Sequence, residues 1–560
     1  MELVMFEGIR PAERPRLLKL KTDQGCPMND VERLKAEKNV LDVKNSLARF
    51  AREGWESISE SDVQRLKWYG LFLRKPTPGF FMLRVRIPNG FSNADQLRVL
   101  SLIATEYGNG LIDITTRQQF QIRHLRIENI EMVFEALESV GLTSLQTGID
   151  NVRNIMGCPV AGLHPKEIID ASPWVKALNQ HILNNSEFVN LPRKFNIAIT
   201  GCPDNCIHTE TQDLALVPAI KTIGGVEHIG FNILAGGKLG SGGYRIASSL
   251  NIFVHPEEVV EVCAEIILLF RDNGYRDSRT QNRLAFLLDE WGEERFREEL
   301  VLRLKRPLET AGQDKRLSEI KDHMGIYRQK KSKMNFVGLK VIVGRILAEE
   351  LFQVAELAHQ YGNGEIRISP NQALIIPNVT DKGLGDFLEE PALKNLLYAP
   401  SAVQKNLVSC VGKDYCHLAT IETKGQAVDV ARRVEEKLDL EKVGPISMHW
   451  SGCPAGCGNH LVADIGLLGK KAKINGEVVD AVDIFVGGRA GPYPKHAVKL
   501  LENVPCEKLP QVLVNIIPYH TRTKMHPIKM KMGSKKKLKT VGTATVPGKA
   551  LPPKPFLTCI

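Results

Sequence analysis

Four cysteines stand close together in the second half of the chain, at spacings that suit a metal centre. Cys410 and Cys416 enclose the segment CVGKDYC, and Cys453 and Cys457 lie in SGCPAGCGNH. They are four of the 11 cysteines in the 560-residue chain. Four thiolates form the ligand set of an iron–sulfur cluster or of a structural zinc ion. Zinc motifs usually use tighter C-x2–4-C pairs, so the C-x5-C spacing favours a cluster.

Several motifs occur twice, in the same order and at nearly one offset. The segment YGNGLIDITTRQQFQI at 107–122 recurs as YGNGEIRISPNQALII at 361–376, an offset of 254. GCPDNC at 201–206 recurs as GCPAGC at 452–457, an offset of 251, and a third match has the same offset. Self-similarity at a fixed offset indicates an internal duplication. We therefore expect two related halves with a shared central site.

The two halves differ in the residues that could do chemistry. The first half has only three related thiols, Cys158, Cys202 and Cys206, so we interpret Cys202 and Cys206 as an inherited remnant rather than as a second metal site. Cationic residues show the opposite bias, because Arg84 and Arg117 correspond to Gly338 and Asn371. One half supplies positive charge and the other supplies thiolates, which fits a redox centre that reduces an anion.

The hydrophobic patterns predict the elements that position these residues. In the first half we expect a strand over 80–90, a helix over 93–108, strands over 111–115 and 119–124, and a helix over 128–140. This order is typical of a ferredoxin-like α/β sandwich. A larger unit follows, with a strand over 193–200 and a helix over 256–273. The fold class predicted is α+β and internally duplicated, with two ferredoxin-like units and two larger α/β units.

The charge is concentrated at one end. Residues 520–560 hold ten Lys and Arg and no acidic residue, which leaves 64 basic and 64 acidic residues in 1–519. A neutral body argues against nucleic-acid binding as the main function, although the tail alone could attract an acidic partner. We find no apolar run long enough to span a bilayer and no export signal, and therefore expect a cytoplasmic protein.

The chain resembles the siroheme-dependent nitrite and sulfite reductases. The resemblance runs from about residue 32 to 512 and includes DNVRNIMGCPVAG and LPRKFNIAI besides the cysteine motifs. It implies a [4Fe–4S] cluster held by Cys410, Cys416, Cys453 and Cys457, with Cys457 also the axial ligand of the siroheme iron. Because Cys453 and Cys457 are four residues apart, we expect one helical turn to direct both sulfurs to one side.

The resemblance also implies roles for the polar residues of the first half. Thr115, Thr116 and Arg117 match the segment that binds the tetrapyrrole. The residues expected to face the substrate on the open side of the haem are Arg84, Arg153, Lys194 and Asn196. Lys194 and Asn196 are two apart on the predicted strand, so their side chains should share one face.

The activity that the resemblance implies is the six-electron reduction of nitrite to ammonium. Reduced ferredoxin would donate the electrons, and we expect a monomer without nucleic acid or membrane span. Reduction of sulfite to sulfide is the alternative. Sulfite reductases typically place a second lysine where Asn196 stands, and ferredoxin-dependent ones tend to carry a Tyr–Cys pair where Phe72 and Asn151 stand. Nitrite is therefore the expected substrate.

The same resemblance suggests where the units divide. The expected divisions are an N-terminal extension over 1–55, ferredoxin-like repeats over 56–140 and 311–395, siroheme-binding α/β repeats over 141–310 and 396–515, and a basic tail over 516–560.

Overall fold

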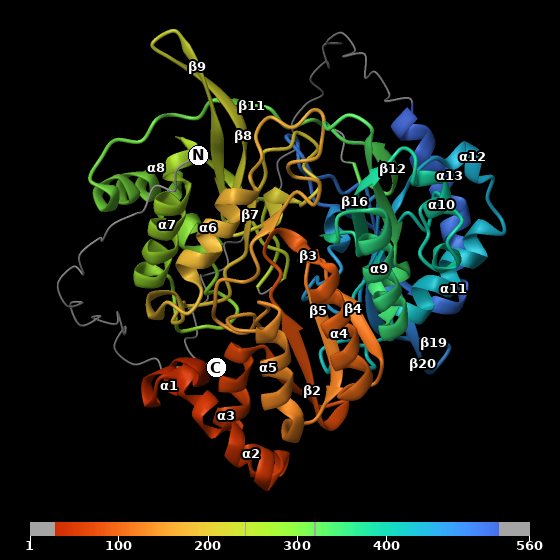
Figure 1. Ribbon diagram of the computed structural model, residues 1–560, viewed down its shortest axis with the longest axis horizontal. Coiled ribbons are helices and arrows are strands. Elements are labelled where there is room, and N and C mark those ends of the chain that lie inside the picture. The colour runs from red at the N-terminus through yellow and green to blue at the C-terminus, as the bar shows by residue number, and fades with distance from the viewer. Residues whose placement is uncertain (1–28, 241, 319–320, 526–560) are drawn as a thin grey trace, which may run out of the picture.

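The computed structural model describes residues 29–525, apart from 241 and 319–320. Four sheets form its framework, two purely antiparallel and two mixed, with helices packed against them (Figure 1). In Figure 1 the N-terminal half, coloured red to yellow-green, fills the lower and left parts of the molecule, and the C-terminal half, coloured cyan to blue, lies on the right. No helix among the described residues has the length and apolar character needed to cross a bilayer.

The two antiparallel sheets exchange strands between the halves of the chain. The strands of the first sheet are β1 (Leu71–Arg74), β2 (Thr77–Val85), β5 (Phe120–Leu125), β4 (Leu111–Ile114) and β14 (Arg345–Leu347). Those of the second sheet are β12 (Gly325–Arg328), β13 (Met334–Lys340), β16 (Ala373–Thr380), β15 (Glu365–Ser369) and β3 (Phe91–Asn93). Each sheet therefore ends in a strand from the other half, with Arg345 opposite Asp113 in one and Arg367 opposite Phe91 in the other.

Helices α4 (Ala94–Glu106) and α9 (Ala348–Tyr361) occupy corresponding places in the two halves and pack together. Their buried leucines, among them Leu97 of α4 and Leu351 of α9, belong to one continuous apolar core. Burying a leucine contributes about 1.5–3 kcal/mol, so this shared core holds the two repeats together. Helix α5 (Ile130–Ser139) covers the first repeat, and the short α10 (Leu384–Leu388) the second.

The two mixed sheets have the same strand order and the same pairing directions. In the first half the strands are β6 (Met156–Gly157), β7 (Ile197–Ile199), β8 (Leu214–Ile223), β9 (Val226–Ala235) and β10 (Ser248–Val254), and β11 (Gln313–Asp314) pairs with β8. In the second half they are β17 (Asn406–Ser409), β18 (Ser447–Ser451), β19 (Ile465–Ile474), β20 (Glu477–Val486) and β21 (Val498–Pro505). The first three strands of each sheet are parallel, so the loops that follow them leave at one edge.

The remaining helices cover these sheets or close the N-terminal end. The first mixed sheet is accompanied by α6 (Ser172–Ile182), α7 (Val259–Asn273) and α8 (Leu284–Leu304), and the second by α11 (Lys424–Glu435), α12 (Leu440–Val443) and α13 (Leu509–Met525). The N-terminal helices, at the bottom of Figure 1, are α1 (Asp30–Glu37), α2 (Leu47–Glu53) and α3 (Glu60–Arg65).

The structure confirms the duplicated α+β fold and most of the predicted elements. The strand predicted over 193–200 is wrong in part, because only Ile197–Ile199 is a strand. Residues 516–525, assigned to the basic tail, belong instead to helix α13. Leu509, Leu513 and Ile517 are spaced four apart and fully buried, which explains why this segment is helical. The tail itself, residues 526–560, and residues 1–28 lie outside the described residues.

Candidate redox and anion-binding site

The four cysteines predicted as cluster ligands line one cavity of about 140 Å³. Cys410 follows β17 directly, and the loop with Cys453 and Cys457 follows the parallel neighbour β18. The loops are tied together, since the Gly452 amide donates to the Cys410 sulfur at 3.2 Å. Among these described thiols no three lie within 4.8 Å of one another. That separation suits a multi-iron cluster better than a single ion.

The predicted helical turn between Cys453 and Cys457 is wrong. The segment forms two successive turns, in which the Gly456 amide donates to the Cys453 carbonyl at 3.2 Å and the Asn459 amide to the Gly456 carbonyl at 2.9 Å. Gly456 has φ +68° and Asn459 has φ +59°, values that end any helical path. Both cysteines nevertheless line the same cavity.

The first half contributes the rest of this cavity. Arg84, Thr115, Thr116 and Arg117 line it together with the four cysteines. The Thr116 hydroxyl donates to the carbonyl of Cys457 at 3.1 Å, so the loop between β4 and β5 directly contacts the second-half cysteine loop. The predicted tetrapyrrole segment and the predicted cluster ligands therefore lie side by side.

Positive charge accumulates on the first-half side of the cavity, where Arg84 and Arg117 line it. Arg153 and Lys194 are not among its lining residues, but both lie close enough to feel the charge of Arg117. Burial, Arg117 and Arg74 lower the pKa of Arg84 to about 9. Burial and the neighbouring Arg84 and Arg117 also hold the pKa of Arg153 well below its usual range. Burial, together with the neighbouring Arg283 and Arg117, likewise holds the pKa of Lys194 well below its usual range. Like charges gathered in this way favour a bound anion.

Asn196 and Lys194 precede β7 and are not part of it. The backbone amide of Asn196 donates to Asp213 Oδ2 at 2.7 Å, and Arg283 donates to both oxygens of that carboxylate at 2.8 and 2.6 Å. The buried Asp213–Arg283 ion pair thus fixes the backbone of Asn196. The side-chain Oδ1 of Asn196 is buried and has no hydrogen-bond partner among the described residues. An unpaired amide oxygen here is free to contact a bound molecule.

Two glutamines that the sequence analysis did not single out join the halves. Gln118 has φ +56°, and its side-chain amide donates to the carbonyls of Gly157 at 2.9 Å and Ile368 at 2.8 Å. Gln372, at offset 254 from it, has φ +60° and donates in the same way to Ile114 at 3.1 Å and Ser409 at 2.9 Å. Each glutamine therefore positions the residue just before a cysteine. Because the glutamine is retained at the same place in both copies of the duplicated segment, the sequence could have indicated that it has a structural role.

A buried ionic network also supports the loop 410–416. Asp113 accepts hydrogen bonds from Arg123 at 2.5 Å and Arg345 at 3.0 Å, and Lys424 lies 3.5 Å away. Both guanidinium groups lie over the ring of Tyr415, with centroid distances of 4.5 and 5.1 Å. Burial would raise the pKa of Asp113, but Arg123, Lys424 and Arg345 together hold it far below its usual range.

Replacing Asp113 with asparagine is expected to lower the free energy of unfolding by about 1.5–3 kcal/mol, the range for hydrogen bonds to charged groups. A carboxyl with a depressed folded-state pKa stabilises the protein above its unfolded pKa of about 3.9, and this contribution is lost as the pH falls further. Urea titrations at pH 7 and at about pH 2.5, on either side of the unfolded pKa, should therefore differ less for Asp113→Asn than for wild type. Asp95→Asn, at an exposed surface ion pair, is the control and should change stability by under about 0.5 kcal/mol.

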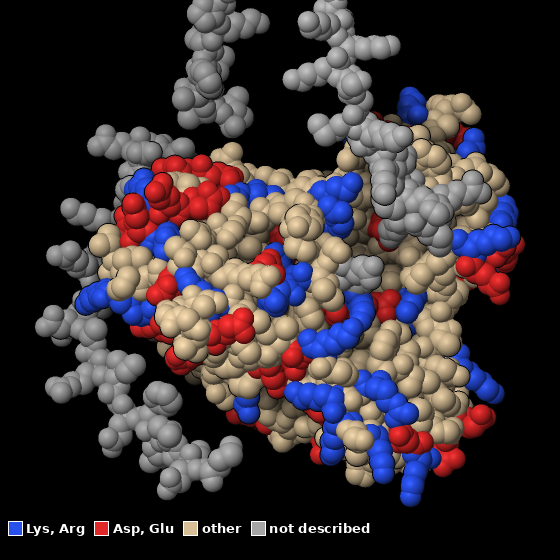
Figure 2. Space-filling view, turned by 90° about the horizontal axis from the view of Figure 1, so that it is seen from above, with Lys and Arg blue, Asp and Glu red and all other residues tan. Residues whose placement is uncertain are grey.

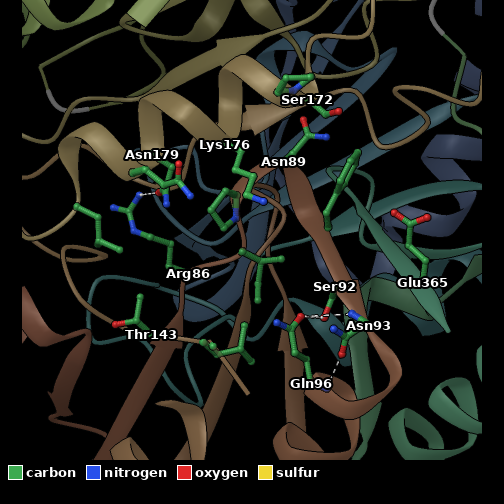
Figure 3. Close-up of a pocket in the computed structure, with 18 residues that line it drawn as sticks. Arg86, Asn89, Ser92, Asn93, Gln96, Thr143, Ser172, Lys176, Asn179 and Glu365 are labelled. Atoms are coloured by element: carbon green, nitrogen blue, oxygen red, sulfur yellow. Dashed lines mark hydrogen bonds between the residues drawn. The ribbon is translucent and has the colours of Figure 1, made fainter. Parts of the chain in front are cut away.

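A larger cavity, about 750 Å³, lies elsewhere and is distinct from this site (Figure 3). Arg86, Asn89 and Gln96 of the first repeat, Lys176 and Asn179 of α6, and Glu365 of the second repeat line it. It contains none of the residues predicted for cofactor or substrate, so its size does not mark the chemical centre.

The outer surface seen from above carries both kinds of charge. Figure 2 shows Lys and Arg side chains interspersed with Asp and Glu side chains over this face, with acidic side chains gathered at one side. The body of the protein is thus not one continuous basic surface here, in agreement with its balanced composition.

Two family models match the chain. The nitrite/sulfite reductase ferredoxin-like half domain matches residues 73–140 and 327–394, and the nitrite and sulphite reductase 4Fe-4S domain matches residues 148–308. The second match spans Cys158, Cys202 and Cys206, whereas the four predicted cluster ligands lie outside it. The matches fall on both halves and define an oxidoreductase built by duplication.

Proteins similar to this chain include the ferredoxin–nitrite reductase of Leptolyngbya laminosa, 42% identical over 88% of this chain and 97% of that protein. The assimilatory ferredoxin-dependent nitrite reductase of Haloferax mediterranei is 36% identical over 85% of this chain and 86% of that protein. Among solved structures, NirA of Mycobacterium tuberculosis matches with a TM-score of 0.84 and 30% identity, over 91% and 95% of the two chains. The chain belongs to the nitrite and sulphite reductase family.

Proposed function

We propose that this protein reduces nitrite to ammonium with electrons from reduced ferredoxin. The observation that carries the proposal is the match to ferredoxin–nitrite reductases over nearly their whole length, at 42% identity over 97% of one such relative. The composition of the cavity supports it, because thiols and cationic groups face the same space.

The residues of the cavity fit the two cofactors of this chemistry. Cys410, Cys416, Cys453 and Cys457 would hold a [4Fe–4S] cluster, with Cys457 shared with the iron of a siroheme. Thr115, Thr116 and Arg117 would bind the peripheral carboxylates of that tetrapyrrole, which gives the arginines of this wall an anionic partner. When bound, the siroheme supplies the iron at which nitrite is reduced, and the cluster supplies electrons singly.

The other residues act on the substrate. Arg84, Arg153 and Lys194 would attract nitrite and donate charge-assisted hydrogen bonds to its oxygens. Forming ammonium and two waters from nitrite takes six electrons and eight protons, so groups that can pass on protons must reach the site. Lys194 is the strongest candidate, because its lowered pKa makes its ammonium group a better acid than an ordinary lysine.

The proposed electron donor is supported by the names of the relatives, which are ferredoxin-dependent enzymes. A diffusible ferredoxin would donate one electron at a time, and the proposal extends to a monomeric protein in the cytoplasm. The test is an anaerobic assay of the full chain, reconstituted with iron, sulfide and siroheme, using reduced ferredoxin. Ammonium should form with six electrons consumed per nitrite, and faster than sulfide forms from sulfite. A preparation that contains both cofactors and yields no ammonium would overturn the proposal.

Asn196→Lys is expected to shift preference toward sulfite by about fivefold in relative kcat/KM. A lysine would add a positive charge beside Lys194, and a charge-assisted hydrogen bond exceeds a neutral one by roughly 1 kcal/mol. Sulfite carries up to two negative charges and gains more from it than nitrite. Both substrates should be assayed on one preparation at matched siroheme content. An unchanged or lower sulfite-to-nitrite ratio would show that Asn196 is not the selector.

The aromatic side chain at Phe72 also belongs to this part of the site. The guanidinium of Arg84 lies 4.9 Å from the Phe72 ring centroid, and Asn151 donates to the carbonyl of Gly148 at 2.8 Å. Neither residue can form a Tyr–Cys link. This difference from the pattern typical of ferredoxin-dependent sulfite reductases supports nitrite as the substrate.

The basic tail would assist docking of an acidic ferredoxin. Residues 526–560 hold eight lysines and no acidic residue. A chain ending at Met525 should keep its turnover with reduced methyl viologen but show a raised KM for ferredoxin, mainly below about 0.1 M salt, where the Debye length exceeds about 10 Å. If the truncated and full chains have the same KM at every salt concentration, the tail does not dock the donor.

A further inference from the structure

A second group of potential metal ligands is buried in the first half. Cys158 follows β6, and Cys202 and Cys206 lie in the loop after its parallel neighbour β7. His323 reaches the same place from the segment that leads into β12. All four are almost completely buried, with 1%, 0%, 3% and 1% of their surface exposed.

The ligand atoms of Cys158, Cys206 and His323 are close enough to one another for a single ion, and the Cys202 thiol adjoins this group. The sulfurs of Cys158 and Cys206 are 3.7 Å apart, and both lie within 4.8 Å of a ring nitrogen of His323. The side chain of Cys202 interacts with the Cys158 thiol. Cys202 also lies within 4.8 Å of His164 and Asp204, so it joins two adjoining groups of ligands.

Several polar atoms here have no partner within the described part of the chain. The Nε2 atom of His323 and both carboxylate oxygens of Asp204 are buried and accept or donate no hydrogen bond. The closest cationic candidate for Asp204 is the Nε2 atom of His164, at 3.4 Å. Buried polar groups in folded proteins are nearly always satisfied, so unpaired ones clustered with thiols point to a cation.

We propose that Cys158, Cys202, Cys206 and His323 hold one zinc ion. Tetrahedral zinc with bonds of about 2.3 Å to sulfur places neighbouring sulfurs about 3.8 Å apart, close to the separation observed here. A disulfide would require about 2.05 Å. Asp204 and His164 lie beside the ion, where a carboxylate can accept a hydrogen bond from a ligand or balance charge.

This proposal replaces the interpretation of the first-half thiols as a remnant. That interpretation was based on finding three sulfurs and no fourth ligand nearby in the sequence. The fold brings His323 to these sulfurs from a distant part of the chain. The alternative, that the thiols are merely apolar core residues, agrees with their neighbours Val160 and Phe336. It does not account for the unpaired His323 nitrogen and Asp204 carboxylate.

The ion would fasten the two halves of the duplicated fold. Arg367 of the second repeat donates to the carbonyls of Pro159 and Ala161 at 3.2 and 3.1 Å, beside Cys158. Gln118 positions Gly157, as Gln372 positions Ser409 before Cys410. The zinc site therefore occupies in one half the place that the predicted cluster occupies in the other. One copy would keep a redox metal and the other a redox-inert one.

The test is metal analysis of the full chain purified without oxygen and with its other cofactors in place. We expect about one zinc per chain, and X-ray absorption at the zinc edge should show three sulfur ligands and one nitrogen. Cys158→Ser and His323→Ala should each lose most of the zinc while iron and acid-labile sulfide per chain stay unchanged. Cys263→Ser is the matched control, because that thiol is fully buried in α7 and belongs to no group of potential metal ligands among the described residues, and it should keep the zinc.

Four results would overturn the proposal. The first two are the absence of zinc from the wild-type protein and an equal zinc content in wild type and Cys158→Ser. The third is a loss of iron and sulfide instead of zinc in Cys158→Ser, which would assign the thiols to a cluster. The fourth is a disulfide between Cys158 and Cys206, detected by thiol counting under denaturing conditions. The zinc content and the zinc-edge absorption spectrum of the wild-type protein test the proposal even if a variant fails to fold.

Discussion

Replacing Cys457 with serine is expected to abolish nitrite reduction. Serine is not a thiolate at neutral pH, and its hard oxygen is a poor ligand for the iron of a cluster or a siroheme. Cys457 is the exposed member of the four thiols, whereas Cys410, Cys416 and Cys453 are half-buried, which suits a sulfur shared with a second cofactor. Changes outside a ligand set already cost about 10–100-fold, so losing the shared ligand should put turnover below detection.

The measurement combines turnover with iron, sulfide and siroheme content per chain. Both cofactors should be lost from Cys457→Ser while circular dichroism stays native, because the loop is held by its own turns and by Thr116. Cys506→Ser provides the matched control, a half-buried thiol just after β21. Cys202→Ser combined with Cys206→Ser should leave the cluster signal intact. Normal cofactor content in Cys457→Ser, or loss of the cluster in the double variant, would refute the ligand assignment.

The fold class could be predicted from the sequence because the duplication repeats the local patterns in both halves. Helix α4 begins with a capping box, in which Gln96 donates to Asn93 at 2.9 Å and accepts from its amide, so its start could be located from residue types alone. The cysteine spacings likewise pointed to a metal centre. Caps and cysteine spacings depend on residues that are close in the sequence, so they can be predicted from the sequence alone.

The features that sequence reasoning missed depend on contacts between distant segments. The exchange of β3 and β14 between the two antiparallel sheets has no local signature, since either strand could equally pair within its own half. His323 stands alone in the sequence, and only the fold brings it to Cys158 and Cys206. The predicted strand over 193–200 failed for a similar reason. The Asn196 amide bonds the carboxylate of Asp213 instead of a neighbouring strand, so regular pairing begins only at Ile197.

Lys194→Met is expected to lower kcat for nitrite by about 10²–10³-fold, the range for losing one preorganised donor in an active site. Methionine keeps much of the side-chain length but has neither charge nor proton. Cofactor content should be unchanged, because Lys194 is not among the predicted metal ligands or the Thr115–Arg117 segment. Lys176→Met, an exposed lysine of α6 beside the larger cavity, is the matched control and should retain full activity.

The pH profile separates a proton-donating lysine from one that only fills space. Burial, Arg283 and Arg117 lower the pKa of Lys194, so the protonated form is lost at a lower pH than for an ordinary lysine. If the ammonium form is required, wild-type activity falls as the pH rises through that lowered pKa. Lys194→Arg should retain part of the rate and move the fall to higher pH, because arginine stays protonated. If Lys194→Met and wild type have the same alkaline limb, or if Lys194→Met keeps more than about a tenth of wild-type kcat, then Lys194 is not the donor.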